Sequence, residues 1–129
     1  MKPFAQQSVS FEDVNQMVWH HLEARDWQHN PSRGIATSIA LEAAELLEHY
    51  QWADEAVGSN DELASELADI LIYAFEFAQS QDIDMVAAIK HKLGVAAKKY
   101  PAEKFKGQKP EDKHKAWLDA KLHYKKTGL

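Results

Sequence analysis

The chain has 129 residues and no cysteine, and 45% of its residues are apolar. This length and composition predict one compact domain with a hydrophobic core and argue against disorder, while the missing cysteine excludes disulfides, thiolate metal sites and a cysteine nucleophile. The net charge of −5 hides a split between the two ends. Residues 1–89 hold 3 Lys/Arg and 16 Asp/Glu, whereas residues 90–129 hold 12 Lys and 4 Asp/Glu. The asymmetry suggests that one end handles cations and the other handles anions.

Targeting signals are missing from the sequence. No run of 18 apolar residues is long enough for a transmembrane helix, and residues 1–10 lack the apolar segment of a secretory signal. We therefore expect a cytoplasmic protein without a membrane partner, and residues 1–10 are expected to form an N-terminal tail.

Capping and periodicity predict the first two helices. Ser10 followed by Asp13 is typical of an N-cap with an acidic first turn, so we expect a helix over residues 11–24. A loop over residues 25–33 follows. Apolar side chains at i, i+3 and i+4 then predict a second helix over about residues 32–50.

Two more helices follow a polar loop. Ser59 and Glu62 have the spacing of a capping box, which opens a third helix over about residues 60–80. The fourth helix is expected to begin at Asp82 or Asp84. It ends before a Lys-Tyr-Pro sequence, because the residue preceding a proline disfavours the helical conformation.

The C-terminal end is expected to form a polar helix. A lysine-rich connector leads to Pro110, which suits the first turn of a helix over about residues 110–125. This helix carries few apolar residues, so we expect it on the surface or against another subunit. No segment alternates as a strand does. The predicted fold is therefore all-α: a four-helix-bundle-like domain with an extra polar C-terminal helix.

Four acidic residues stand out on the second and third predicted helices. Glu42 and Glu45 are three residues apart, as are Glu66 and Asp69, so each pair shares one helix face. At about 100° per residue, Glu42 and Glu66 fall inside the apolar stripes of their helices. Ordinary solvated glutamates are the alternative, but two such pairs on adjacent helices favour a shared site.

Carboxylates that face one another away from water need neutralisation, because an unpaired buried charge is strongly destabilising. Arg25 and Arg33 are the only arginines, so protonation or a bound divalent cation remains. Oxygen ligands without cysteine fit a hard ion, Mg²⁺ with Mn²⁺ as a substitute.

The histidines, His49 among them, show no metal-ligand spacing, and we expect them on the surface. A di-iron bundle would need two Glu-x-x-His pairs. Only Glu111 with His114 matches that pattern, which excludes a di-iron site.

The carboxylates and their neighbours resemble, in order, the MazG-type, all-α nucleoside triphosphate pyrophosphohydrolases. The likeness is greatest to the single-domain branch that includes the dCTP pyrophosphatases. The motifs that carry it are Arg25-Asp26-Trp27, His29 with Pro31, Glu42-Ala43-Ala44-Glu45, Gln51-Trp52, Glu66-Leu67-Ala68-Asp69, Ile72-Tyr73 and Lys99-Tyr100-Pro101. The resemblance covers about residues 11–107, the expected domain, and leaves residues 108–129 as a C-terminal extension.

The resemblance implies Mg²⁺-dependent hydrolysis of nucleoside triphosphates to a monophosphate and pyrophosphate. Its substrate would be dCTP-like or a modified pyrimidine, removed to clean the nucleotide pool. Glu42, Glu45, Glu66 and Asp69 would bind the metal and carry catalysis. Either an unliganded carboxylate oxygen or Glu48 would take the proton of the attacking water. The family also implies a homo-oligomer with a dimeric four-helix core, as a homodimer or a homotetramer (dimer of dimers).

The resemblance assigns aromatic residues to the nucleotide. Trp27 and Trp52 would line the base pocket, although packing in the core is the commoner role of a tryptophan. Tyr73 lies one turn beyond Asp69, so its hydroxyl could reach the sugar or a phosphate.

Basic residues near the end of the fourth predicted helix are candidates for binding phosphate. Lys92 and Lys99 share one face, and Tyr100 follows them. The alternative is a solvated, lysine-rich helix end that suits the helix dipole. Ala96 stands where the family usually has an asparagine, which leaves the base specificity open.

Other functions remain open at this point. A dimeric dUTPase or a phosphoribosyl-ATP pyrophosphohydrolase belongs to the same superfamily, but Trp27 with Trp52 argues for the dCTP-like branch. A different class is a basic-tailed helical module that binds nucleic acid or protein without catalysis. Replacing Glu66 by alanine separates the two classes, because it abolishes pyrophosphate release by an enzyme and leaves tail-mediated binding intact.

Overall fold

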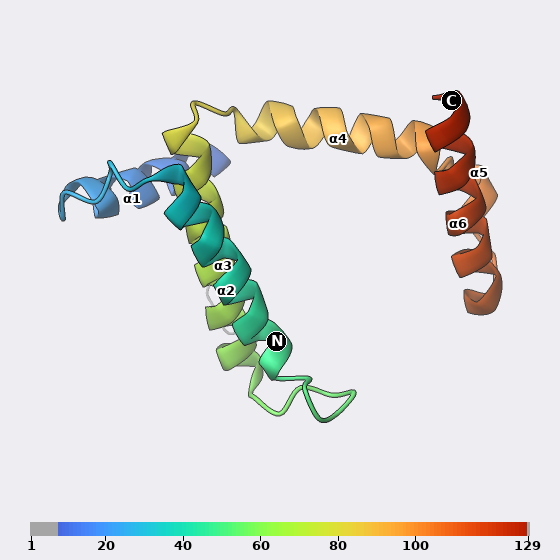
Figure 1. Ribbon diagram of the computed structural model, residues 1–129, viewed down its shortest axis with the longest axis horizontal. Coiled ribbons are helices and arrows are strands. Elements are labelled where there is room, and N and C mark those ends of the chain that lie inside the picture. The colour runs from blue at the N-terminus through green and yellow to red at the C-terminus, as the bar shows by residue number, and fades with distance from the viewer. Residues whose placement is uncertain (1–7, 129) are drawn as a thin grey trace. The chain divides into compact units, whose positions relative to one another are not determined.

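A computed structural model describes residues 8–128, and every regular element in that range is a helix. The elements are α1 (Phe11–Glu23), α2 (Ser32–Glu48), α3 (Asn60–Ser80), α4 (Met85–Lys99), α5 (Ala102–Phe105) and α6 (Pro110–Thr127) (Figure 1). The all-α prediction is confirmed. The helices form two compact units, Met1–Ile83 and Asp84–Leu129. Most of the predicted N-terminal tail, residues 1–10, lies outside the described residues, and the domain boundary at residue 107 stays a prediction.

Capping boxes begin α1 and α3, as predicted. The hydroxyl of Ser10 accepts a hydrogen bond from the backbone N–H of Asp13 at 3.1 Å, and the Asp13 carboxylate accepts one from the Ser10 N–H at 2.8 Å. Ser59 and Glu62 exchange the same pair of bonds at 3.2 and 2.6 Å. Because its carboxylate accepts two bonds from Ser59, the pKa of Glu62 is lowered.

The ends of the later helices follow from local conformation. Asp84 caps α4 by accepting a bond from the N–H of Ala87, whereas Asp82 lies in the preceding turn with a φ of 53°. Pro110 occupies the first turn of α6, as expected. The connector between α4 and α6, expected to be irregular, contains the one-turn helix α5.

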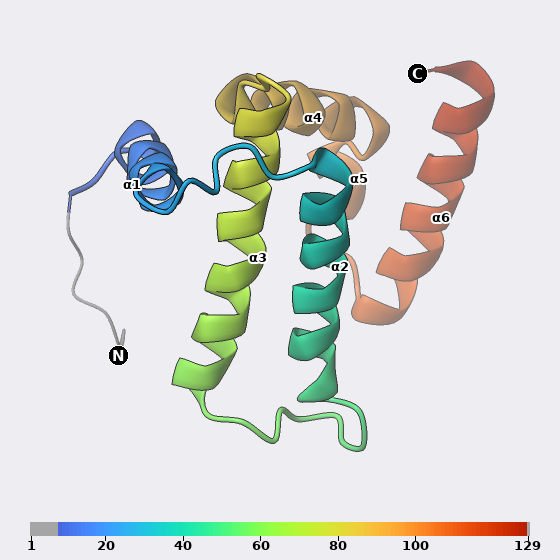
Figure 2. The ribbon, with the colours of Figure 1, turned by 60° about the vertical axis from the view of Figure 1, so that its left-hand side comes forward.

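In the first unit, α2 and α3 lie side by side and antiparallel, and α1 packs against α3 (Figure 2). The core of this unit is small. Val18 and Leu22 of α1 pack against Phe75 of α3, with Val14 beside them. The ring of Phe11 lies 4.9 Å from that of Phe75, between centroids. This core lies at the C-terminal end of α3.

Polar contacts reinforce the same end of the unit. The side-chain amide of Gln79 donates to the carbonyl and the side-chain oxygen of Asn15, which ties α3 to α1. Asn30, in the loop before α2, donates to the carboxylate of Glu76 at 2.9 Å. The start of α2 is thereby held against the end of α3.

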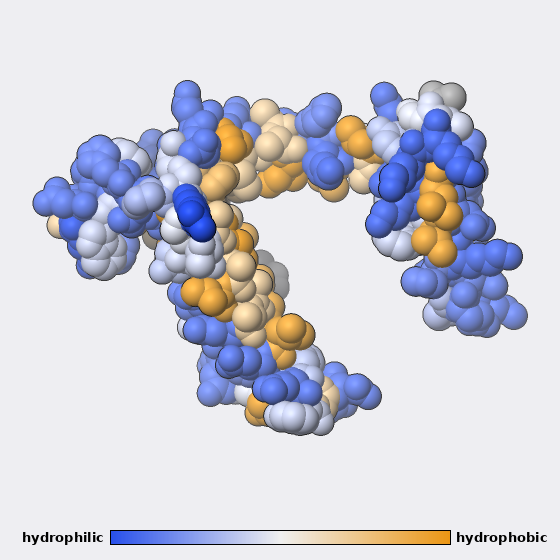
Figure 3. Space-filling model, in the orientation of Figure 1, coloured by the Kyte–Doolittle hydropathy of each residue, from blue (hydrophilic) through white to orange (hydrophobic). Residues whose placement is uncertain are grey.

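The rest of the α2–α3 pair is thinly covered. Ile35 is the one fully buried residue of α2, and α3 buries only Phe75, Glu76 and Ala78, near its C-terminus. Apolar surface extends along the pair (Figure 3). The exposed large apolar side chains of the two helices are Leu41, Leu47, Leu67, Leu71 and Ile72. A helix pair that buries so little of its apolar surface has a face available for another layer.

The second unit is held by aromatic contacts. Tyr100 stacks on Trp117 of α6, with ring centroids 6.1 Å apart and planes at 9°, and contacts Phe105 of α5 edge-on. Helix α6 has no buried residue, as its polar sequence predicts.

The search for membrane-spanning helices covers the described residues of both units. None of their helices combines the length and the apolar character that a membrane span requires.

Candidate metal and substrate site

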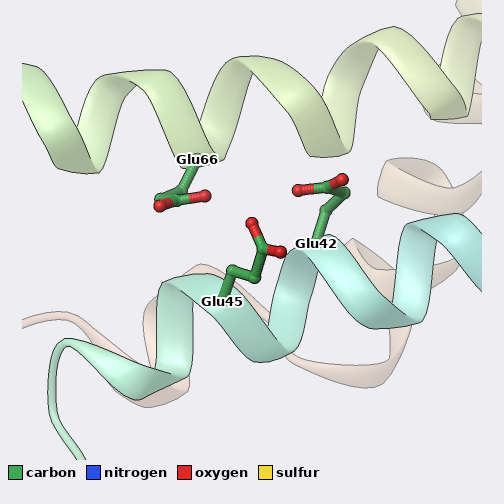
Figure 4. A group of neighbouring side chains, drawn as sticks. All are labelled: Glu42, Glu45 and Glu66. Carbon is green, nitrogen blue, oxygen red and sulfur yellow. The ribbon is translucent and has the colours of Figure 1, made fainter.

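Three glutamates converge between α2 and α3. Glu42 and Glu45 point from α2 toward α3, and Glu66 points from α3 toward them (Figure 4). One carboxylate oxygen of each lies within 4.8 Å of the other two. Ligand oxygens on opposite sides of Mg²⁺ are about 4 Å apart, because each bond is about 2.0–2.1 Å. The three oxygens must therefore move closer together before one ion can hold all of them.

The pKa of Glu42 shows that bringing these carboxylates together is electrostatically unfavourable. Its pKa is raised, first by desolvation and then by the neighbouring charge and hydrogen bond of Glu45 and the charges of Asp69 and Glu66. Its Oε2 atom is buried and has no hydrogen-bond partner. Both observations describe a carboxylate that lacks a positive partner.

A protein cation does not fill that role in the part of the chain described. Within residues 8–128, the one ion pair under 4.0 Å joins His49 to Glu66, and no lysine or arginine is involved. The atoms available as metal ligands are carboxylate oxygens, and the Oε2 atom of Glu42 has no hydrogen-bond partner. This donor set fits a hard divalent cation such as Mg²⁺ or Mn²⁺.

Asp69, the fourth predicted ligand, lies outside the group of three within 4.8 Å. It is half-buried on α3, one turn beyond Glu66, and its charge contributes to the raised pKa of Glu42. Its part in binding a metal stays a prediction.

The prediction that His49 lies on the surface is wrong. Its side chain is only 14% exposed, and Nε2 lies 3.6 Å from Oε1 of Glu66. The loop after α2 folds back over the imidazole, where a Cβ on Gly58 would come within 2.4 Å of the ring. The N–H of Val57 donates to the carbonyl of His49 at 2.9 Å, which holds the loop closed. The spacing of His49 four residues after Glu45, one turn along the same helix face, was the available signal.

A cavity of about 300 Å³ opens beside these groups. It is lined by Glu45, Glu48, His49, Val57 and Glu66. Glu48, considered from the sequence as a proton acceptor, therefore shares a cavity with two of the three converging glutamates.

The two tryptophans expected at the base pocket are not part of the core. Trp27, between α1 and α2, is 50% exposed, and Trp52, after α2, is 88% exposed. Core packing, the alternative weighed from the sequence, therefore does not occur in this chain. Their stacking on a base stays a prediction.

Tyr73 lines a second cavity, of about 260 Å³, between the beginning of α2 and the later part of α3. The other residues that line it are Asn30, Pro31, Gly34, Ile35, Ser38 and Glu76. Glu76 was not identified from the sequence, although it lies seven residues after Asp69 and between two phenylalanines. On the helical wheel it falls near Asp69 and outside the apolar stripe that contains Glu66, so the flanking phenylalanines were the available signal.

Lys92, Lys99 and Tyr100 belong to the second unit. Lys92 is exposed on α4, and the ammonium of Lys99 lies 5.4 Å from the ring centroids of both Tyr100 and Tyr124. Cation–π contacts of this kind hold the Lys99 side chain in place. The binding of phosphate by these residues stays a prediction.

Substitution of Glu42 by glutamine should stabilise the metal-free protein. Because the pKa of Glu42 is raised from 4.5, the folded state loses stability as the pH rises above that value and the carboxyl ionises. We expect the melting temperature of the variant at pH 7 in EDTA to exceed that of the wild type by a few degrees. With saturating Mg²⁺, the wild type should gain more than the variant.

The matched control is Glu55→Gln, which neutralises an exposed carboxylate in the loop after α2. It should leave both melting temperatures unchanged. A Glu42→Gln protein that melts below the wild type in EDTA would contradict this account of the electrostatics.

Comparisons with known proteins agree with the fold. A model of the MazG-like family matches residues 37–114. Human dCTP pyrophosphatase 1 is 27% identical over 103 residues, and the alignment covers 72% of this chain and 60% of that protein. The crystal structure of a pyrophosphatase from Archaeoglobus fulgidus is also 27% identical, with a TM-score of 0.60, and the match covers 76% of this chain and 98% of that one. The chain belongs to the MazG-like family.

Proposed function

We propose that the chain is a metal-dependent nucleoside triphosphate pyrophosphohydrolase, which cleaves between the α- and β-phosphates. The observation that carries this proposal is the convergence of Glu42, Glu45 and Glu66 with an orphaned carboxylate oxygen. Membership of the MazG-like family and the pyrophosphatase names of two relatives support the same activity.

The metal is proposed to be Mg²⁺, with Mn²⁺ as a substitute, held by Glu42, Glu45, Glu66 and Asp69. When bound, it would neutralise phosphate charge and lower the pKa of water. The protein's own contribution is to hold acidic side chains on two paired helices, so that the triphosphate is positioned with little rearrangement. The position of Glu48 in the cavity with Glu45 and Glu66 favours it as acceptor of the proton from the attacking water.

The proposed substrate is a dCTP-like or modified pyrimidine nucleotide, removed from the nucleotide pool. The name of the human relative supports a cytosine base. The exposed rings of Trp27 and Trp52 lie at opposite ends of α2, so one copy of the chain can supply only one of them for stacking on a given base. Lys92, Lys99 and Tyr100 would contact the phosphates, with the lysines supplying positive charge.

Pyrophosphate release from a panel of common and modified nucleoside triphosphates, with Mg²⁺, tests the activity. Glu66→Ala should lower kcat/KM by at least about 100-fold, because loss of a neighbour of a metal ligand alone costs about 10- to 100-fold. Asp61→Ala removes an exposed carboxylate from the same helix and should leave the rate unchanged.

Wild-type protein that releases no pyrophosphate from any nucleotide would overturn the proposal. Salt-sensitive DNA binding that persists in Glu66→Ala, without hydrolysis, would instead favour the binding-module alternative.

The active form is proposed to be a homodimer or a dimer of dimers. The exposed apolar surface of α2 and α3 supports this, since those helices bury few residues where the glutamates converge. A second copy of the pair would complete a four-helix bundle and remove that surface from water.

Leu71→Lys should disrupt this association. Leu71 is 52% exposed on α3, and a charge there would be desolvated in an interface. Sedimentation velocity should give a dimer or larger species for the wild type and a lighter species for the variant. Met17→Lys, at a 63% exposed position of α1, is the control and should leave the mass unchanged. A wild-type mass of 14.7 kDa would contradict the proposed assembly.

A further inference from the structure

We propose that Glu76 selects nucleotides whose base carries an exocyclic amino group. The inference rests on the proposed function and adds to it a residue that determines the substrate. It starts from a buried acidic group that the proposed hydrolysis does not use.

Glu76 is a buried carboxylate with only part of its hydrogen-bonding capacity used. Its residue exposure is 5%, and Oε1 accepts one bond, from the side-chain amide of Asn30 at 2.9 Å. Among the described residues, no donor bonds to Oε2 and no cation pairs with the group. A carboxylate has about four sites for accepting hydrogen bonds, so most of them remain available. Oε2 is not among the fully buried unpartnered atoms, so a ligand can reach it.

The carboxylate lines a cavity of suitable size and composition. The cavity holds about 260 Å³, below the range of about 300–1,000 Å³ for sites that enclose a drug-sized ligand. A single base therefore suits it better than a whole nucleotide. Ile35 supplies an apolar wall, and Ser38 and Tyr73 add hydroxyl groups.

Helix geometry places this cavity at a useful distance from the converging glutamates. Ser38 precedes Glu42 by four residues, and Glu76 follows Glu66 by ten. At 1.5 Å per residue, the cavity begins about 6 Å from the converging glutamates, and Glu76 lies about 15 Å along α3 from Glu66. An extended nucleoside triphosphate spans such an interval, so a nucleotide with its phosphates at the glutamates can put its base beside Glu76.

Hydrogen-bond chemistry then decides which bases fit. An ionised carboxylate only accepts hydrogen bonds, and the amino group of cytosine is a donor that Glu and Asp recognise. Uracil carries a carbonyl oxygen at the same position, which would put two acceptors face to face. A site built around one polar group discriminates strongly against an analogue that leaves the group unpaired.

The test compares dCTP with dUTP, which differ in the group at position 4, amino or carbonyl, and in the proton that uracil carries on the neighbouring ring nitrogen. Wild-type protein should prefer dCTP in kcat/KM by about 10- to 100-fold, the range expected of one charged hydrogen bond. Glu76→Gln should remove most of this preference, because an amide can donate to the uracil oxygen. The change should fall mainly on KM, since the contact is made equally in the ground and transition states.

A second variant keeps the test valid if the Glu76→Gln protein does not fold. Asn30→Ala keeps the carboxylate but frees it to rotate, and should weaken the preference. Glu55→Gln, an exposed carboxylate outside the cavity, should keep the wild-type preference. Wild type without a preference, or the same preference in both cavity variants, overturns the inference.

The affinities of the protein for dCMP and dUMP, measured by titration calorimetry, test the role of Glu76 independently of the proposed hydrolysis. If no triphosphate is hydrolysed, the activity fails, but tighter binding of dCMP that Glu76→Gln abolishes still supports the role of Glu76. Hydrolysis without a difference between the two monophosphates overturns the role of Glu76 and leaves the activity standing.

Discussion

Repulsion among carboxylates between α2 and α3 is the constraint on which the rest of the structure depends. Glu42, Glu45 and Glu66 bring like charges within 4.8 Å, and the raised pKa of Glu42 records the cost. Within residues 8–128, no lysine or arginine lies within 4.0 Å of these carboxylates, and the His49 imidazole contacts Glu66. If the proposed divalent cation binds there, the site gives up stability of the metal-free protein in exchange for binding.

The distribution of packing follows from this constraint. The core of the first unit lies where α1 meets the end of α3, away from the converging glutamates. Around those glutamates, the capping box of Ser59, the loop closed over His49 and the pairing of the two helices supply the order. The apolar surface that remains on α2 and α3 is consistent with a second copy completing the bundle, so binding of metal and assembly would stabilise the same helices.

The features predicted correctly from the sequence, such as helix caps and shared helix faces, depend on interactions between residues close together in the chain. The caps at Ser10 and Ser59 depend on residues three apart, and the shared face of Glu42 and Glu45 depends only on helix periodicity. The roles of His49 and Glu76 depend on contacts between distant residues. Burial of His49 needs the absence of a side chain at Gly58, and Glu76 is held by Asn30, 46 residues away in sequence. Periodicity alone contains no such information.

Binding of Mn²⁺, followed by electron paramagnetic resonance, tests the central claim most directly. The wild type should bind Mn²⁺ saturably without nucleotide, because the converging carboxylates are held together by the helices that carry them. A variant with Glu42, Glu45 and Glu66 all replaced by glutamine should stay helical by circular dichroism and lose that binding. Equal binding by the two proteins, or none by the wild type, would contradict the assignment of these carboxylates as a metal site.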